Sequence, residues 1–528
     1  MTPALPEHPK PATDSSSDRL PVEVDLPDQG GGQAKRRRGI RRREVLFGGG
    51  GLALGIAGAF AGIGTANAIA SSSTASSGTS SAPAYTLQRF TSTMVTAPKL
   101  SIWRPSGAAL ADGYVFSTPQ TDEFSPAIYD VDGTLIWSHP GGGAGTDFRV
   151  QRYEGQSVLT YWTGTSQYGN GQGHGVILDA SYRPIAHVYA RGGLQADLHE
   201  FELTDAGTAL ITAYPPVRAD LTSIGGSADG WMFDCHIQEI DVSTNELLLD
   251  WRASDHIPLG ESYQPLGTDG GSAPSAYDPY HLNAISADTA DTLLLSARHT
   301  HTVYSLDRKT GEIRWRLGGK KSDFTVDQSA AFAWQHDARR QSATEISMFD
   351  NHVNTSKGTS RGLVLTVDEA AKTARLKQEY ADKNHVGYAM GSTQLLQNGN
   401  VLVGWGTQPY ATEFTSDGTA VWEASGLGDT CYRVAKSIWV GQPQADPDVA
   451  AVVDASGRLH VYASWNGATR VASWQVLSGA SEDSLAAVAT VPKNGFETTT
   501  AIDAAAHVQV VALDAQGVRL GASAVIAA

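Results

Sequence analysis

Cysteine is almost absent from this chain of 528 residues. Its two cysteines, Cys235 and Cys431, are too few for a disulfide framework or for a zinc site made of three or four cysteines of one chain. Charged residues make up only 18% of the chain, which excludes long charged helices and coiled coils. Lys and Arg number 39 against 55 Asp and Glu, and the net charge of −16 disfavours binding to nucleic acid.

Several catalytic motifs are missing as well. The chain has no G-x-x-x-x-G-K-[ST] phosphate loop, no G-x-S-x-G nucleophile turn, and no C-x-P-x-R around either cysteine, the motif that provides the nucleophile of formylglycine sulfatases. The sequence therefore points away from nucleotide-dependent phosphate chemistry, from serine hydrolases and from that class of sulfatase.

Glycine is abundant, with 56 residues, and 41% of the chain is apolar, a composition that favours an all-β protein rich in turns. At this length we expect two or more folding units. A polar turn followed by an alternating strand recurs six times, at intervals typical of one propeller blade each. These copies begin at Asp132, Asp179, Asp241, Asp307, Asp368 and Asp417. The pattern predicts a six-bladed β-propeller over residues 85–442; five or seven blades, or two packed sandwiches, have a similar periodicity.

Residues 449–528 have a different pattern, in which short strands alternate with turns such as Asn466-Gly467. This spacing predicts a small β-sandwich of the immunoglobulin or fibronectin type III kind. Trp465 and Trp474 are its expected core aromatics, and we expect the unit to bind or to act as a spacer.

The sequence pattern of the first 84 residues predicts a targeting region and not a folded domain. Residues 1–34 have the composition of a disordered extension, residues 35–68 that of a signal peptide, and residues 69–84 that of a flexible linker. Arg42 and Arg43 before an apolar, glycine-containing stretch resemble a twin-arginine export signal, with a cleavage site at Ala66 and Ala68. We expect the protein to be exported to the cell envelope or beyond by the twin-arginine machinery; an uncleaved segment would be its only contact with a membrane.

Histidine is concentrated in the middle of the chain, where ten of the fifteen lie between His174 and His352. The chemistry-bearing candidates are His199, His281, Asn283, Arg298 and His336, which belong to different predicted blades. Inner strands of a propeller converge on its axis, so these residues can meet there. Imidazole can act as a nucleophile, a base or a metal ligand, and Arg and Asn can hold anionic oxygens. Arg298 disfavours a metal among these histidines, because two cations would repel.

The chain resembles the arylsulfotransferase family over residues 85–440. The segments that carry the resemblance are Asp197 to Phe201, Leu203 to Tyr214, Tyr280 to Asn283, Ser296 to His299, Thr310 to Gly319, Trp334 to His336 and Phe349 to Asn351. This family consists of exported six-bladed propellers that move sulfate between phenols without a nucleotide donor.

The resemblance implies that His336 is the nucleophile, transiently sulfated in a ping-pong reaction, and that His199, His281 and Arg298 are catalytic. His199, His281, Asn283 and Arg298 would also bind the substrates, a phenol and an aryl sulfate ester, with no cofactor and no metal. The short-range disulfide of the better-known branch has no counterpart here, and a long-range bridge between Cys235 and Cys431 stays open. Two alternatives remain: a propeller that binds a ligand or cell-wall polymer without catalysis, and a metal enzyme that uses the same histidines.

Overall fold

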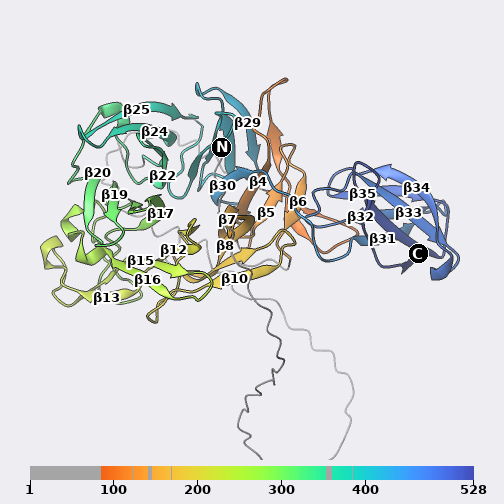
Figure 1. Ribbon diagram of the computed structural model, residues 1–528, viewed down its shortest axis with the longest axis horizontal. Coiled ribbons are helices and arrows are strands. Elements are labelled where there is room, and N and C mark those ends of the chain that lie inside the picture. Colours follow the sequence, from red (N-terminus) through yellow and green to blue (C-terminus); the bar gives the residue numbers. More distant parts are fainter. Residues whose placement is uncertain (1–84, 123, 141–144, 168, 353–358, 383) are drawn as a thin grey trace, which may run out of the picture. The chain divides into compact units, whose positions relative to one another are not determined.

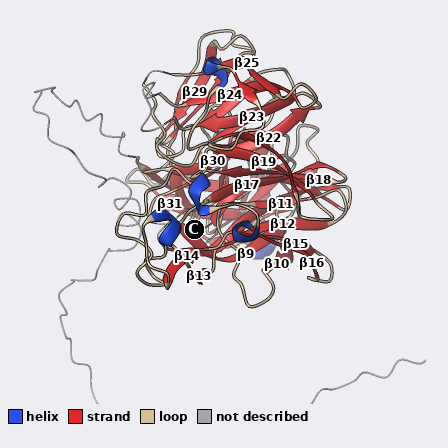
Figure 2. Ribbon diagram, turned by 90° about the vertical axis from the view of Figure 1, so that its left-hand side faces the viewer, coloured by secondary structure: helices blue, strands red, loops and turns tan. Residues whose placement is uncertain are grey.

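The computed structural model describes residues 85–122, 124–140, 145–167, 169–352, 359–382 and 384–528. In these residues the regular structure is strand, apart from five short 3-10 turns, and the all-β prediction is confirmed (Figure 2). The turns are η1 (Thr222–Ile224), η2 (Ala253–Asp255), η3 (Leu259–Glu261), η4 (Gln328–Ala330) and η5 (Glu482–Ser484). Within the same ranges, no helix has the length and apolar character to cross a bilayer. The predicted extension, signal peptide and linker, residues 1–84, lie outside the described residues.

Six sheets of four or five strands, antiparallel except for one short added strand, follow one another between residues 101 and 437 (Figure 1). The first contains β4 (Tyr114–Pro119), β5 (Ala127–Tyr129) and β6 (Leu135–Ser138), and the second β7 (Gly145–Tyr153), β8 (Gln156–Gln167), β9 (Asn170–Leu178) and β10 (Pro184–Val188). The third contains β11 (Phe201–Leu203), β12 (Thr208–Ala213), β15 (His236–Asp241) and β16 (Leu247–Arg252), and the fourth β17 (Leu282–Thr289), β18 (Thr292–Ala297), β19 (Thr302–Asp307) and β20 (Ile313–Gly318). The fifth contains β22 (His336–Ser342), β23 (Glu345–Asp350), β24 (Arg361–Asp368) and β25 (Thr373–Tyr380), with β21 (Thr325–Val326) added in parallel. The sixth contains β26 (Ser392–Leu395), β27 (Val401–Gly404), β28 (Tyr410–Phe414) and β29 (Ala420–Ser425).

The six repeated turns lead into the last strand of each consecutive run, namely β6, β10, β16, β20, β25 and β29. An aspartate fixes several of these turns by accepting backbone N–H bonds two to four residues ahead; Asp179 Oδ1 accepts from Ser181 and Arg183, for example. Trp137, Trp251, Trp315 and Trp422 on these strands are buried. The repeat seen in the sequence is therefore the last hairpin of each sheet.

The ends of this region share sheets. β3 (Ser101–Trp103) pairs with β29 and completes the sixth sheet, and β30 (Cys431–Ser437) pairs with β4 and completes the first. Neighbouring sheets contact one another in chain order, and the last contacts the first: β7 meets β11, β12 meets β17, β17 meets β22, β22 meets β26, and β30 meets both β26 and β7. The strand at one edge of each sheet thus faces its neighbours, except that the third sheet meets the fourth through its second strand, β12.

The remaining strands form smaller sheets. β1 (Leu87–Arg89) pairs with β2 (Thr96–Pro98), and β13 (Pro216–Ala219) with β14 (Gly230–Phe233). At the C-terminal end, one sheet holds β31 (Asp448–Val453), β32 (Leu459–Ser464) and β35 (Glu497–Ile502), and a second holds β33 (Ser473–Gly479), β34 (Ala486–Pro492), β36 (His507–Leu513), β37 (Arg519–Ala522) and β38 (Ile526–Ala527). Trp474 is buried in a core to which both sheets contribute, and Trp465 packs against that core half-buried.

Cys235 and Cys431 are both buried and both free. Burial raises the pKa of the Cys431 thiol to about 12, and that of Cys235 is raised as well. Neither thiol is therefore a reactive thiolate at neutral pH, and the long-range disulfide left open by the sequence is not formed.

Candidate active site

The five candidate residues lie at or near the ends of the first two strands of three adjacent sheets. His199 comes two residues before β11, His281 directly before β17, and His336 is the first residue of β22. Asn283 is the second residue of β17, and Arg298 follows β18 directly. Because β12 contacts β17 and β17 contacts β22, these segments are brought together. The rings of His199 and His281 are 4.7 Å apart, and the positive charge of Arg298 acts on His336.

His336 is buried and held in one tautomer. Both N–H groups of the Asn351 amide donate to backbone carbonyls, those of Gly387 at 2.7 Å and Met390 at 3.0 Å. The Oδ1 atom of Asn351 therefore faces His336 and accepts a bond from its Nδ1–H at 2.7 Å. This arrangement leaves the lone pair on Nε2, where the Met390 backbone N–H donates to it at 3.2 Å. Burial, and then the charge of Arg298, lower the pKa of His336 well below its usual range, so the ring is neutral.

Arg298 is a buried guanidinium without an acidic partner. It donates to Nε2 of His299 at 2.9 Å and to the Tyr388 carbonyl at 3.1 Å, and its Cζ lies 4.8 Å from the centre of the Trp334 ring. No carboxylate lies within 4 Å of it in the described part of the chain, and its buried Nε has no partner there. Burial lowers the pKa of Arg298 to about 10, which leaves it charged at neutral pH.

Other buried arginines of the protein, unlike Arg298, form ion pairs with carboxylates. Arg433 binds Asp147 at 2.7 Å and Glu200 at 3.2 Å, and Arg361 binds Asp350 at 3.1 Å. A buried cation is costly unless an anion compensates it. Arg298 is held only by neutral acceptors and an aromatic face, so its charge is available to an anion from outside the chain.

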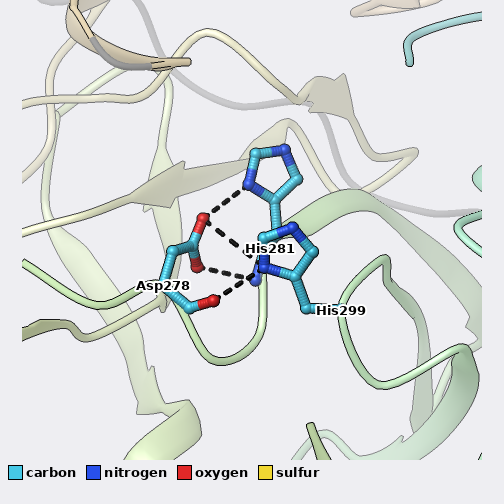
Figure 3. Close-up of side chains that lie close together, drawn as sticks. All are labelled: Asp278, His281 and His299. Atoms are coloured by element: carbon cyan, nitrogen blue, oxygen red, sulfur yellow. Dashed lines mark hydrogen bonds and ion pairs between the residues drawn. The ribbon is translucent and has the colours of Figure 1, made fainter. Parts of the chain in front are cut away.

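Two carboxylates orient the histidines next to Arg298. His199 Nδ1 lies 2.6 Å from Asp197 Oδ2, and His281 Nδ1 lies 2.6 Å from Asp278 Oδ2. Asp278 also accepts a bond on its backbone carbonyl, from His299 Nδ1 at 2.7 Å, and Figure 3 shows both imidazole rings turned toward it. The interactions with His281 and His299 outweigh burial and lower the pKa of Asp278, while burial lowers the pKa of His281. An ionised Asp278 thus faces a neutral His281.

Asn283 is fully buried and adjoins the nucleophile candidate through the backbone. Its Nδ2 donates to the carbonyl of Gln335 at 2.8 Å, and its Oδ1 has no partner within the residues that the structure describes. One N–H and the carbonyl oxygen of the amide therefore stay uncommitted, so the structure places Asn283 at the site without fixing which group it offers.

The metal alternative fits this site poorly. Asp278, His281 and His299 have ligand atoms close enough for one ion. However, His299 donates from Nδ1 to a carbonyl and accepts from Arg298 on Nε2, so both its nitrogens are occupied. A divalent ion here would also lie next to an arginine that no carboxylate balances.

The backbone at the site is strained. His281, His301, Trp334, Asp337, His352 and Met390 have φ between 49° and 62°, in the left-handed region that non-glycine residues avoid. These six are more than half of the eleven such residues in the described chain. Strain of this kind persists where packing enforces it and is concentrated at functional sites.

The sequence did not assign several residues that shape the site. Asn351 and His299 lie within the segments that carry the family resemblance, but no role was inferred for them, and Asp197 and Asp278 precede their histidines by two and three residues. The segment 387–390 was missed altogether, because it acts through the backbone groups of Gly387, Tyr388 and Met390. The short Asp-to-His spacings were the one signal that could have revealed the two carboxylates.

Comparison with solved structures gives only distant similarities. A protein of unknown function from Bacteroides caccae has 12% identity and a TM-score of 0.36, covering 61% of this chain and 98% of its own. The β-propeller domain of Myceliophteria thermophila Cps50 (Swd1) has 12% identity and a TM-score of 0.32, with 67% and 98% covered. A catalytically inactive variant of virginiamycin B lyase from Staphylococcus aureus has 7% identity and a TM-score of 0.32, with 70% and 96% covered.

Comparison with curated proteins gives no match. The family model described as arylsulfotransferase (ASST) matches residues 149–426, which is more than half of the chain and includes all five candidate residues. The chain therefore belongs to the arylsulfotransferase family.

Proposed function

We propose that the protein transfers a sulfuryl group from an aryl sulfate ester to a phenol through a sulfated His336. The observation that carries this proposal is a neutral imidazole with its lone pair on Nε2, close to a buried guanidinium that forms no ion pair with a carboxylate among the described residues. A sulfuryl group in transfer carries negative charge on three oxygens, as a phosphoryl group does. It would supply the anion that Arg298 lacks.

In the first half-reaction, the Nε2 lone pair of His336 attacks sulfur, an N–S bond forms, and the S–O bond to the aryl group breaks. The phenolate departs with the electron pair of that bond. Because the negative charge of the bound ester favours the protonated form of a nearby imidazole, His199 or His281 takes up a proton when the ester binds and gives it to the phenolate. The His336 ring becomes an N-sulfated imidazolium whose remaining proton, on Nδ1, is held by Asn351. The Met390 N–H, which points at Nε2, then donates to a sulfuryl oxygen.

In the second half-reaction, a phenol replaces the departed product. His199 or His281, now neutral, accepts the phenolic proton while the phenol oxygen attacks sulfur and the N–S bond breaks. Because the imidazolium leaves as a neutral ring, the intermediate is a good sulfuryl donor. Each histidine has its Nδ1 against a carboxylate, which directs Nε2 to this exchange.

We further propose the architecture and location that accompany this function. The six sheets form the blades of a propeller over residues 85–442, supported by the order of contacts between them, and residues 449–528 form a separate sandwich. Residues 35–68 direct export by the twin-arginine route, as the arginine pair and the apolar stretch after it indicate.

Rapid mixing with 4-nitrophenyl sulfate tests the reaction. We expect a burst of 4-nitrophenol equal to one equivalent of protein, followed by turnover only when a phenol is added. His336→Ala should lose the burst, and His460→Ala, which replaces a histidine of the C-terminal sheets, should keep it. Binding of the ester without release of 4-nitrophenol would contradict the proposal and favour the alternative of a binding propeller.

A further inference from the structure

A row of aromatic rings leads from Arg298 to the surface. Trp334 lies under the guanidinium, the ring of His301 is 4.5 Å from that of Trp334, and Tyr263 stacks on His301 at 4.1 Å with an angle of 4° between the planes. We call Trp334, His301 and Tyr263 the aromatic row. Trp334 is buried, whereas Tyr263 is 42% exposed, so the row reaches from the candidate active site to solvent.

A second unpaired cation lies at the outer end of this row. Lys320 Nζ is 4.8 Å from the centre of the Tyr263 ring and, like Arg298, forms no ion pair with a carboxylate within the described ranges. It donates to the carbonyls of Gly260 at 3.1 Å and Ser262 at 2.5 Å. An ammonium group has three N–H donors, so one remains for a ligand.

His301, the middle residue of the row, has a nitrogen without a hydrogen-bond partner and is subject to the positive charges of Arg298 and Lys320. The buried Nε2 of His301 has no hydrogen-bond partner among the described residues. Burial, then Arg298 and then Lys320 lower the pKa of His301 to about 3, and the remaining cause, His352, acts in the same direction. The imidazole is therefore neutral, and its Nε2 is a polar group without a partner between two cations.

From this geometry we propose that the aromatic row and Lys320 form a subsite for the remote end of the substrate, which binds aryl sulfates and phenols that carry a carboxylate away from the reacting oxygen. This inference rests on the proposed function for the identity of the reacting group. The aryl ring would lie along the row, the sulfuryl group would face Arg298, and the carboxylate would reach Lys320. A carboxylate would balance the second unpaired cation as a sulfuryl group balances the first.

Lys320 also has a structural role, because its two carbonyl bonds hold the turn after η3. Loss of that role would change stability and the rates of all substrates alike. The ratio of rates for two substrates that differ only in charge should therefore stay the same if Lys320 has only a structural role. Lys321, the next residue, is exposed and provides a matched control of the same charge.

The test uses aryl sulfates of increasing reach: 4-carboxyphenyl, 4-(2-carboxyethyl)phenyl and 4-(4-carboxybutyl)phenyl sulfate, each with its neutral methylamide. We expect at least one carboxylate to exceed its amide by about tenfold in kcat/KM, a free-energy difference near 1.4 kcal/mol. Lys320→Gln should bring this ratio close to one, whereas Lys320→Arg and Lys321→Gln should retain it. Raised salt should lower the ratio in the wild type.

Equilibrium binding separates failure of the subsite from failure of the reaction. Isothermal titration with the matching 4-(carboxyalkyl)phenols needs no turnover, and Lys320→Gln should weaken their binding by about tenfold relative to the amides. If 4-nitrophenyl sulfate releases no 4-nitrophenol but Lys320→Gln still weakens binding of the carboxylates, the proposed sulfuryl transfer is refuted and the carboxylate subsite is supported. If no carboxylate is preferred over its amide, or if the preference survives Lys320→Gln, the subsite is refuted.

Discussion

At the scale of single residues, the site depends on groups that orient a reactive atom without changing its charge. Asn351 holds the Nδ1–H of His336 with a neutral oxygen, and His299 holds Arg298 with a neutral nitrogen. A carboxylate in either place would favour an imidazolium or neutralise the guanidinium. The neutral acceptors keep His336, the proposed nucleophile, uncharged and leave Arg298 charged.

Asn351→Ala should slow the burst of 4-nitrophenol. Without the amide oxygen, the His336 ring loses the bond that selects its tautomer, and the rate should fall on the order of 100-fold while substrate binding changes little. Stopped-flow measurement of the burst against donor concentration separates rate from affinity. Asn494→Ala, at an exposed position in the loop between β34 and β35, is the control. An unchanged rate in Asn351→Ala would show that another group selects the tautomer of His336.

Arg298→Lys tests whether the guanidinium is more than a positive charge. Lysine has no planar fork for two sulfuryl oxygens, and it cannot keep the contacts with His299, the Tyr388 carbonyl and the Trp334 ring together. The burst rate should fall by roughly 100-fold, as when a donor to a developing oxyanion is removed. Rates within a few-fold of wild type would mean that charge alone is sufficient.

The sequence named candidate residues that the structure brings near one another, but it did not show how their side chains are held. His199, His281, Asn283, Arg298 and His336 could be named because their segments resemble family motifs. Their Nδ1 partners, the tautomer of His336 and the absence of a counter-ion for Arg298 depend on side-chain orientation in three dimensions. No spacing along the chain encodes that orientation.

At the scale of structural elements, a buried ion network next to His199 joins strands of four sheets. Glu200, just before β11, is fully buried and binds Arg149 of β7 at 2.8 Å, Arg339 of β22 at 2.6 Å and Arg433 of β30 at 3.2 Å. These three arginines outweigh burial and hold the pKa of Glu200 below its usual range. One carboxylate therefore connects four sheets.

Glu200→Gln should be strongly destabilising. The substitution leaves buried guanidinium groups with too little negative charge, which costs about 3–5 kcal/mol of unfolding free energy. Glu369→Gln also removes an arginine's partner, but that side chain is 43% exposed, and the cost should be about 1 kcal/mol or less. Denaturant unfolding of both variants measures the difference; equal costs would show that the network does not join the sheets.

The loop after β25 shows why part of the site escapes prediction from sequence. Its contribution consists of the carbonyls of Gly387, Tyr388 and Met390 and the N–H of Met390. Every residue has these groups, so no residue type indicates them. Their direction comes from the left-handed turn at Met390, which the surrounding packing enforces.

At the scale of the whole molecule, the turn repeat could be recognised in the sequence because each copy, the last hairpin of a sheet, has a local cause. An aspartate that caps its own turn, followed by an alternating strand with a buried tryptophan, can be read from about ten residues. The pairing of β3 with β29 and of β30 with β4 joins residues more than 300 apart, and no local pattern predicts such pairing. The all-β class followed from composition; the strand order did not.

Buried neutral histidines make the stability of the molecule depend on pH. The pKa values of His281, His299, His301 and His336 are lowered in the folded protein. Below the unfolded value, near 6.5, the unfolded chain binds protons that the folded chain refuses. The stability from these groups is therefore complete above pH 6.5 and is lost as pH falls toward their folded pKa values.

Comparing wild type with His301→Gln isolates one of these groups, whose folded pKa is about 3. Between pH 6 and 4 the unfolding free energy of the variant should fall less steeply than that of the wild type, by about 1 kcal/mol per pH unit. Urea unfolding across this range measures both slopes. Parallel slopes would contradict a neutral, buried His301.

The most direct test of the central claim is the intact mass of the protein after brief mixing with excess 4-nitrophenyl sulfate. We predict a gain of about 80 Da, the mass of SO₃, in the wild type, mapped to the peptide containing His336 and lost when phenol is added. His336→Ala should gain nothing. Release of 4-nitrophenol without any adduct, or an adduct that persists in His336→Ala, would contradict a sulfated His336.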